Sequence, residues 1–189
     1  GGWADSISGQ LFALESVLRD AGERVRSAAT SALLVRAEHA DDIIGVMRLA
    51  ARYPAFNWVI VGGAEAHLVA PQLAAANMGV MLSQPRCRRI SLDRMRCTRD
   101  RVRPLLAAGV RVALSQSEGD MLRGLRLDAG HEFARNRASG IEALRMVTQA
   151  PAQMLGNADQ RGIGALMPMH KARLVVYNAH PLLMGSHAL

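Results

Sequence analysis

The sequence predicts an α/β protein built from about four βα units, and three observations support this class. From residue 32 onward, short apolar runs alternate with longer amphipathic stretches, the pattern of parallel strands joined by crossover helices. The composition is 50% hydrophobic and 21% charged, which lies outside the range of disordered chains. The 189 residues suffice for a core, and two cysteines exclude a disulfide-stapled miniprotein.

The first unit begins with the apolar run 33–37, which predicts a strand. We expect the helix after it to begin at Asp41 or Asp42, because a carboxylate there can accept hydrogen bonds from the first free N–H groups. Its apolar residues recur with helical spacing, and Pro54 ends it.

Turn and helix-end residues also delimit the remaining βα units. The Gly62-Gly63 pair predicts a turn after the second strand, and Gly109 closes the helix that precedes the fourth. Ser139 or Gly140 starts the last helix. Strands are thus expected at 33–37, 58–61, 80–82 and 110–114, and helices at 42–52, 64–77, 104–108, 121–137 and 140–149.

The two ends of the chain depart from this alternation. Residues 6–29 have helical spacing, whereas the runs 162–168 and 172–177 predict two short strands around a turn. The expected organisation is therefore an N-terminal helical segment at 1–30, the βα units at 31–155 and a β-strand tail at 156–189.

The positive charge is concentrated in one segment. Between Arg86 and Arg111 there are nine arginines against Asp93 and Asp100, an excess equal to the net charge of +7 of the whole chain. Such a basic patch either is a solvated loop rich in arginine or contacts an anion, an acidic protein or RNA, since guanidinium groups suit phosphate and carboxylate partners. The candidate anion- or RNA-binding residues are Arg86, Arg88, Arg89, Arg94, Arg96, Arg99, Arg101 and Arg103.

Several runs resemble the amidohydrolase superfamily in its imidazolonepropionase-like branch. The similarity covers about residues 30–183 and corresponds to the C-terminal half of that family. It implies half of a (β/α)8 TIM-like barrel, with a tail that joins a small β-sandwich. The runs are Arg36-Ala37-Glu38-His39-Ala40-Asp41-Asp42-Ile43, Val59-Ile60-Val61-Gly62-Gly63-Ala64-Glu65-Ala66-His67, Ala107-Ala108-Gly109-Val110-Arg111-Val112-Ala113-Leu114, Glu142-Ala143-Leu144-Arg145-Met146-Val147-Thr148-Gln149-Ala150-Pro151-Ala152, and Lys171-Ala172-Arg173-Leu174-Val175-Val176-Tyr177 with Pro181-Leu182.

The resemblance also implies a chemistry, the hydrolysis of C–N bonds by a metal-activated water. The family holds its metal with histidines at strand ends and one aspartate, which also serves as the general base. Here the fifth-strand histidine falls on Glu38, the sixth-strand histidine on Gly62 and the aspartate on or near Ser117, and no His-x-His occurs. We therefore assign no catalytic residue, no metal and no cofactor.

Some acidic and histidine residues remain weak metal candidates, because they follow predicted strands. Glu65 is more simply the carboxylate in the first turn of its own helix, and His67 a partly exposed surface residue. The five weak candidates are Glu38, His39, Glu65, His67 and Glu118.

Three functions stay open at this point. The first is a catalytically silent amidohydrolase-like protein that acts as a structural or interaction subunit of a larger assembly. The second is a metal-dependent amidohydrolase completed by a missing N-terminal half, and the third is an RNA-binding accessory subunit. Half a barrel exposes two sheet edges, so we expect another protein chain as partner: the missing half, a second copy or a larger complex. The cysteine content fits an intracellular location, cytoplasmic or organellar, and no apolar run is long enough to span a membrane.

Overall fold

The computed structural model describes most of the chain, with gaps between the described ranges. Within these ranges, no helix combines the length and the apolar character needed to cross a bilayer. The described residues are 7–20, 32–83, 100–116, 124–156, 163–164, 168 and 174–189.

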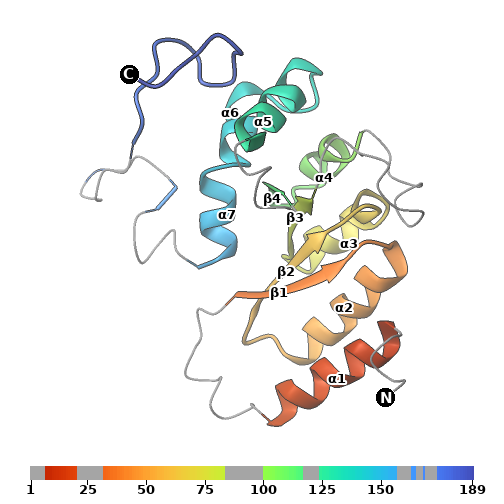
Figure 1. Cartoon of the computed structure of the whole chain (residues 1–189). Coiled ribbons are helices and arrows are strands. Elements are labelled where there is room, and N and C mark those ends of the chain that lie inside the picture. Colours follow the sequence, from red (N-terminus) through yellow and green to blue (C-terminus); the bar gives the residue numbers. More distant parts are fainter. Residues whose placement is uncertain are drawn as a thin grey trace.

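One four-stranded parallel sheet organises the fold, with the strands in the order β1-β2-β3-β4 (Figure 1). Each strand pairs with the next one along the chain, as crossover connections of a single hand produce. This confirms the predicted α/β class. The strands are β1 (Ala32–Ala37), β2 (Asn57–Gly62), β3 (Gly79–Ser83) and β4 (Val112–Ser115).

Helices connect and flank the strands, as the alternating pattern predicts. The predicted helix at 121–137 is shorter among the described residues. The one predicted at 140–149 ends at Arg145, and a second short helix begins at Gln149. The helices are α1 (Ile7–Asp20), α2 (Ala40–Arg52), the 3-10 turn η1 (Ala66–Val69), α3 (Ala70–Ala75), α4 (Val102–Ala107), α5 (Leu125–Ala134), α6 (Gly140–Arg145) and α7 (Gln149–Met154).

Helix α2 begins two residues before the expected position. Its N-cap is His39, whose side chain makes no capping hydrogen bond, and Asp41 and Asp42 lie in the first turn. The Ala40 N–H instead donates to the carboxylate of Glu65 at 3.0 Å. The prediction of an aspartate cap was wrong because the capping acceptor comes from a different segment.

The predicted helix over 64–77 is interrupted. Residues Ala66–Val69 form a 3-10 turn, and a separate α-helix begins at Ala70 with Pro71 in its first turn. Proline has no N–H to bond to the carbonyl four residues earlier, so a continuous helix through this point would lose a hydrogen bond, whereas a first turn tolerates it.

Two apolar clusters lie on the two faces of the sheet. The larger includes Ile43 of α2 and Ile60 of β2, both fully buried. The smaller joins Val59, Met81 and Ala113 of the sheet to Ala150 and Met154 of α7. Helix α7 therefore covers part of the face that half a barrel would expose.

The two edges of the sheet differ. At β4, the Leu114 N–H donates to the carbonyl of Met146 at 3.0 Å, and α7 packs against this strand. The chain itself thus supplies one backbone partner to β4, and cover of the two edges by another chain stays a prediction. Strand β1 is the other edge of the described sheet.

The C-terminal tail contacts α5. Arg126 donates to Pro181 O and to the hydroxyl of Ser186, both at 2.7 Å. The described tail contains an isolated antiparallel bridge between Tyr177 and Ala188. A β-sandwich is not shown: 174–176 carry no strand, and most of the two predicted strands lies outside the described residues. The expected divisions at 30/31 and 155/156 stay predictions.

A capping box fixes the start of α6 and gives a first testable prediction. The Ser139 hydroxyl accepts from Glu142 N at 3.2 Å, and the Glu142 carboxylate accepts from Ser139 N at 2.7 Å. Changing Ser139 to alanine should lower the free energy of unfolding by about 1 kcal/mol. Urea unfolding at neutral pH measures it, and an unchanged midpoint would contradict a stabilising cap.

Candidate functional site

The carboxyl ends of β1 and β2 bring together two positions that the sequence singled out. Glu38 follows β1 directly, and Gly62 is the last residue of β2. Ala37 pairs with Gly62 in register, and the Gly63 N–H donates to Ala37 O at 2.9 Å. Glu38 therefore leaves the sheet next to Gly62.

The carboxylate of Glu38 fills the space that a side chain at position 62 would need. A Cβ on Gly62 would lie 2.5 Å from Oε1 and 2.7 Å from Cδ of Glu38. The φ of Gly62 is +105°, a conformation that favours glycine. Glu38 Oε2 accepts from Ala64 N at 3.2 Å, and Oε1 lies 3.5 Å from Arg36 Nη2.

Glu65 caps a helix other than the one expected. Its carboxylate accepts from Ala40 N at the start of α2, and His39 Nδ1 lies 3.6 Å from Glu65 Oε1. The interaction with a helix N-terminus is the one predicted, but it involves α2 and not the helix that follows Glu65. Glu65 is buried and serves a structural purpose here.

His67 lies close to this group and is half-buried. Its Nδ1 is buried and has no hydrogen-bond partner among the described residues. Burial lowers the pKa of His67, the positive charge of Arg101 lowers it further, and Glu65 acts in the opposite direction. Neutral His67 is thus the form that the folded chain favours.

A buried arginine supplies positive charge near the same strand ends. Arg101 precedes α4 and is only 2% exposed. Burial lowers the pKa of Arg101, while the carboxylates of Glu38 and Glu132 raise it by attraction. Glu132 is 1% exposed, and its Oε1 lies 3.3 Å from Arg137 Nη1. Nothing in the spacing distinguishes Arg101 from its neighbouring arginines, so the sequence did not predict its burial.

These residues do not fit a metal site. Among the described residues there is no cluster of three or more histidine, cysteine or acidic side chains that could ligate an ion. Glu38 and Glu65 already accept backbone N–H groups, and Glu38 fills the place of a ligand at 62. Ser117 and Glu118 lie outside the described residues.

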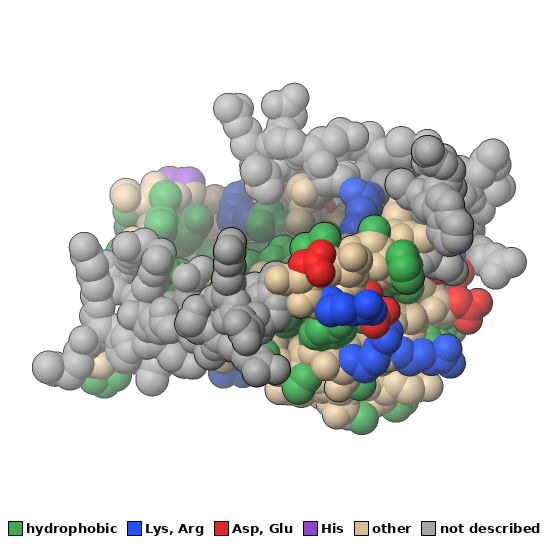
Figure 2. Space-filling view, turned by 90° about the horizontal axis from the view of Figure 1, so that it is seen from below, with side chains coloured by type: hydrophobic (Ala, Val, Ile, Leu, Met, Phe, Trp, Pro, Cys, Tyr) green, Lys and Arg blue, Asp and Glu red, His purple; other side chains and the backbone are tan. Residues whose placement is uncertain are grey.

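The described arginines of the basic segment make contacts within the chain. Arg101 is buried, Arg103 donates to Asn136 O at 2.6 Å, and Arg111 donates to Asn77 O at 2.9 Å. On the face shown in Figure 2, basic side chains lie beside acidic ones. The other six candidates, Arg86, Arg88, Arg89, Arg94, Arg96 and Arg99, lie outside the described residues, so their binding to an anion or RNA stays a prediction.

The lowered pKa of His67 predicts a pH dependence of stability. The unfolded chain binds a proton at this histidine near pH ~6.5, whereas the folded chain binds it only at lower pH. The contribution of neutral His67 to the free energy of unfolding is therefore complete above about pH 6.5. It is lost as the pH falls toward the pKa of His67 in the folded chain. The urea concentration at the unfolding midpoint should decrease as the pH is lowered from about 7.5 to about 5.5. This decrease should be smaller in His67→Gln. His187→Gln, which replaces an exposed histidine in the same way, is the control for the substitution itself. An equal fall in His67→Gln and in the unmodified chain would contradict the assignment.

Comparisons with known proteins agree with the fold and extend it. No family model matches the chain. A stretch of 106 residues, 51% of this chain, is 38% identical to the amidohydrolase tasK of Hapsidospora irregularis and spans 11% of that protein. The crystal structure of an amidohydrolase from Thermotoga maritima MSB8 superposes with a TM-score of 0.78 at 26% identity, over 95% of this chain and 51% of that one.

The chain thus spans about half the length of its structural relative and a small part of its curated one. The parallel sheet with its crossover helices corresponds to part of a TIM-like amidohydrolase barrel. Both relatives carry the name amidohydrolase, which is the family that the sequence resembles. In sequence and in fold, the chain is thus similar to part of an amidohydrolase.

Proposed function

We propose that this chain is a catalytically silent amidohydrolase-like protein that serves as a structural or interaction subunit of a larger assembly. One observation carries the proposal: the Glu38 carboxylate lies where a side chain at Gly62 would be. The resemblance gives both positions to metal ligands. One of them has no side chain, and the other is held by Ala64 N–H and Arg36.

The electrostatics of the site support the same proposal. Arg101 is buried and interacts with the charge of Glu38, so this carboxylate already has a cationic neighbour within the chain. A divalent ion at Glu38 would stand near that guanidinium and would be repelled by it. The charges at the strand ends are thus balanced without a metal.

A metal-dependent amidohydrolase completed by a second half is the alternative that the test must separate. In that case the Glu38 carboxylate would give up its hydrogen bond from Ala64 N and would coordinate the ion. RNA binding by the basic segment gains no support from its described arginines, since Arg101 and Arg103 make contacts within the chain.

The metal content of the purified chain distinguishes a catalytically silent protein from a metal-dependent amidohydrolase. The purified chain, dialysed after loading with zinc, iron or manganese, should hold well below one equivalent of any of them by elemental analysis. Changing Glu38 to alanine should leave both this content and the background hydrolysis of C–N bonds unchanged. One full equivalent that is lost in Glu38→Ala would overturn the proposal and favour the amidohydrolase.

A further inference from the structure

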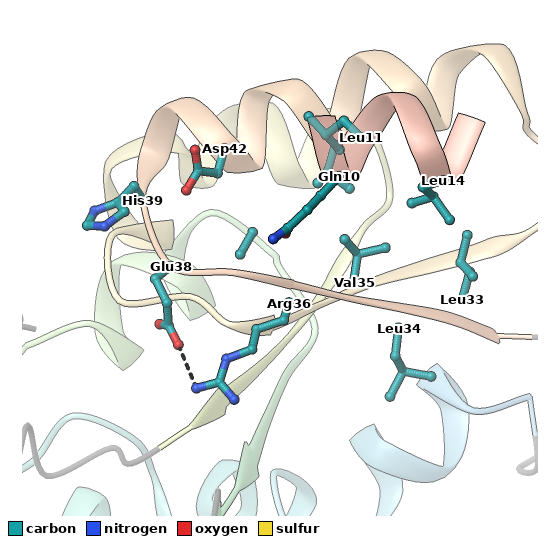
Figure 3. Close-up of a pocket in the computed structure, with 12 residues that line it drawn as sticks. Gln10, Leu11, Leu14, Leu33, Leu34, Val35, Arg36, Glu38, His39 and Asp42 are labelled. Atoms are coloured by element: carbon teal, nitrogen blue, oxygen red, sulfur yellow. Dashed lines mark hydrogen bonds and ion pairs between the residues drawn. The ribbon is translucent and has the colours of Figure 1, made fainter. Parts of the chain in front are cut away.

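The two sides of the described sheet differ in what lies against them. Next to β1, a cavity of about 400 Å³ lies between this strand and α1 (Figure 3). It is at the edge where a partner of the kind already expected would bind. On the side of β4, helix α5 packs against the sheet, and the C-terminal residues of the same chain lie on α5 (Figure 1). We call residues 176–189 the C-terminal clasp.

The C-terminal clasp is held together by its own main chain. Leu189 N donates to Val176 O at 2.9 Å, so the two ends of the clasp lie side by side. In the turn between them, Ser186 N donates to Leu183 O at 3.1 Å. These hydrogen bonds join the clasp to itself and not to α5. Its residues should therefore attach to the helix and detach from it together.

The guanidinium group of Arg126 in α5 attaches the clasp. Its Nη1 lies 2.7 Å from Pro181 O and 2.7 Å from Ser186 Oγ. Ser186 O at 3.3 Å and Leu183 O at 3.4 Å are also within hydrogen-bond distance of this nitrogen. A terminal guanidinium nitrogen carries only two hydrogens, so it cannot bond four oxygens fully. The four oxygens form a cup that suits a cation, and the ring of Tyr177 adds a cation–π contact 5.8 Å from Cζ.

The remaining contact area between the clasp and the helices is small. Leu182 is 7% exposed and is the apolar anchor of the clasp. Its carbonyl oxygen lies so close to α5 that a Cβ on Gly130 would be 2.8 Å away. The ring of His180 stacks on Phe133 with 5.8 Å between the ring centres. Most of the other clasp residues face solvent, and Met184 is 89% exposed.

We infer that the C-terminal clasp is a conformational device that detaches from α5 as one unit while the sheet stays folded, with the guanidinium of Arg126 as its latch. Segments with few buried apolar contacts are the ones that open locally, and Leu182 is the buried apolar anchor of the clasp. Opening uncovers α5 at Gly130 and Phe133 together with Leu182. The clasp therefore controls access to this apolar surface, whether or not the chain binds a metal.

Amide hydrogen exchange of the full chain, followed by NMR, measures this opening. Arg126→Ala removes the guanidinium and leaves the four oxygens without a cation. An isolated two-stranded hairpin is at most marginally stable in water, so the amides of a detached clasp exchange. The rates at Ser186 and Leu189 should rise by the same factor, at least about tenfold, because hydrogen bonds to a charged group are lost. The amides of β2 should keep their rates. Unchanged rates in the clasp, or a rise at Ser186 alone, would overturn the inference.

Two controls isolate the latch. Arg135→Ala removes an exposed arginine at the C-cap of the same helix and should leave the exchange of the clasp unchanged. Guanidinium chloride at millimolar concentration, far below the molar range that unfolds proteins, should slow the exchange in Arg126→Ala, because the ion can enter the vacated cup. Sodium chloride at the same concentration should not. Equal effects of the two salts, or an equal rise in Arg135→Ala, would refute Arg126 as the latch.

A second variant tests the same opening from the apolar anchor and serves if Arg126→Ala does not fold. Leu182→Ala should also raise the exchange rates at Ser186 and Leu189 by one common factor, because the clasp loses its buried side chain. Met184→Ala, at an exposed position of the same turn, is its control and should leave both rates unchanged. A folded Leu182→Ala whose clasp exchanges as slowly as that of the unmodified chain contradicts a clasp that detaches as one unit.

Discussion

Replacing Arg101 by methionine should lower the free energy of unfolding by about 3–5 kcal/mol, because it removes buried positive charge that compensates the carboxylates of Glu38 and Glu132. Arg101 is 2% exposed and Glu132 1% exposed, so water cannot replace the lost guanidinium. Glu132 retains Arg137 as a partner, and Glu38 retains Arg36. These contacts still compensate part of the negative charge, so the loss should lie toward the lower end of that range. Urea or thermal unfolding of the variant and the unmodified chain measures the difference.

Two further variants separate charge from packing. Arg103→Met removes an exposed arginine of the same segment and should cost about 1 kcal/mol or less. Arg101→Lys keeps the positive charge but not the planar fork, and it should recover only part of the loss. If Arg101→Met were no more destabilising than Arg103→Met, the buried guanidinium would not balance Glu38 and Glu132.

At the carboxyl ends of β1 and β2, contacts within the chain stand where the resemblance implies a metal ion. The resemblance implies a metal ion where carboxylate and histidine ligands meet. In this chain Glu38 faces a backbone N–H and the field of Arg101, both supplied by the chain itself. The fold therefore keeps its charges balanced at this end with its own residues, which is consistent with the proposed structural role.

The strands were predictable because parallel strands buried on both faces appear as continuous apolar runs. The run 58–61 became β2 with one residue added at each end. The run 110–114 was placed too early, since Val110 N–H bonds to Leu105 O and closes α4 before β4 begins at Val112. Where local hydrogen bonds compete with the sheet, apolar character alone does not define the boundary.

For the candidate site, the sequence could predict which positions lie together but not the contacts that their side chains make. The resemblance identified Glu38 and Gly62 as neighbouring ligand positions, and the register of β1 and β2 places them together. Their contact depends on the φ of Gly62 and on the side-chain direction of Glu38, neither of which a sequence specifies. The burial of Arg101 depends on how α4 packs against the sheet, so local spacing carries no signal for it.

Changing Gly62 to alanine should destabilise the chain strongly, for two reasons that can be measured separately. The φ of +105° is strained for any residue with a Cβ, at about 1–3 kcal/mol. The new Cβ would also lie 2.5 Å from Glu38 Oε1, and moving this carboxylate aside would break its hydrogen bond from Ala64 N, which adds about 0.5–1.5 kcal/mol. Gly109→Ala is the matched control, because Gly109 has φ +80° and nothing within 4 Å of an added Cβ. It should show the backbone strain alone.

A double-mutant cycle then isolates the contact between the two positions. In Glu38→Ala the carboxylate is gone, so Gly62→Ala in that background should lose only the strain seen at Gly109. The two substitutions should therefore couple by about 0.5–3 kcal/mol, the double variant being more stable than the sum of the singles predicts. Purely additive effects would mean that Glu38 does not occupy the space beside Gly62. The observation that carries the proposed silence would then fail, even if the chain bound no metal.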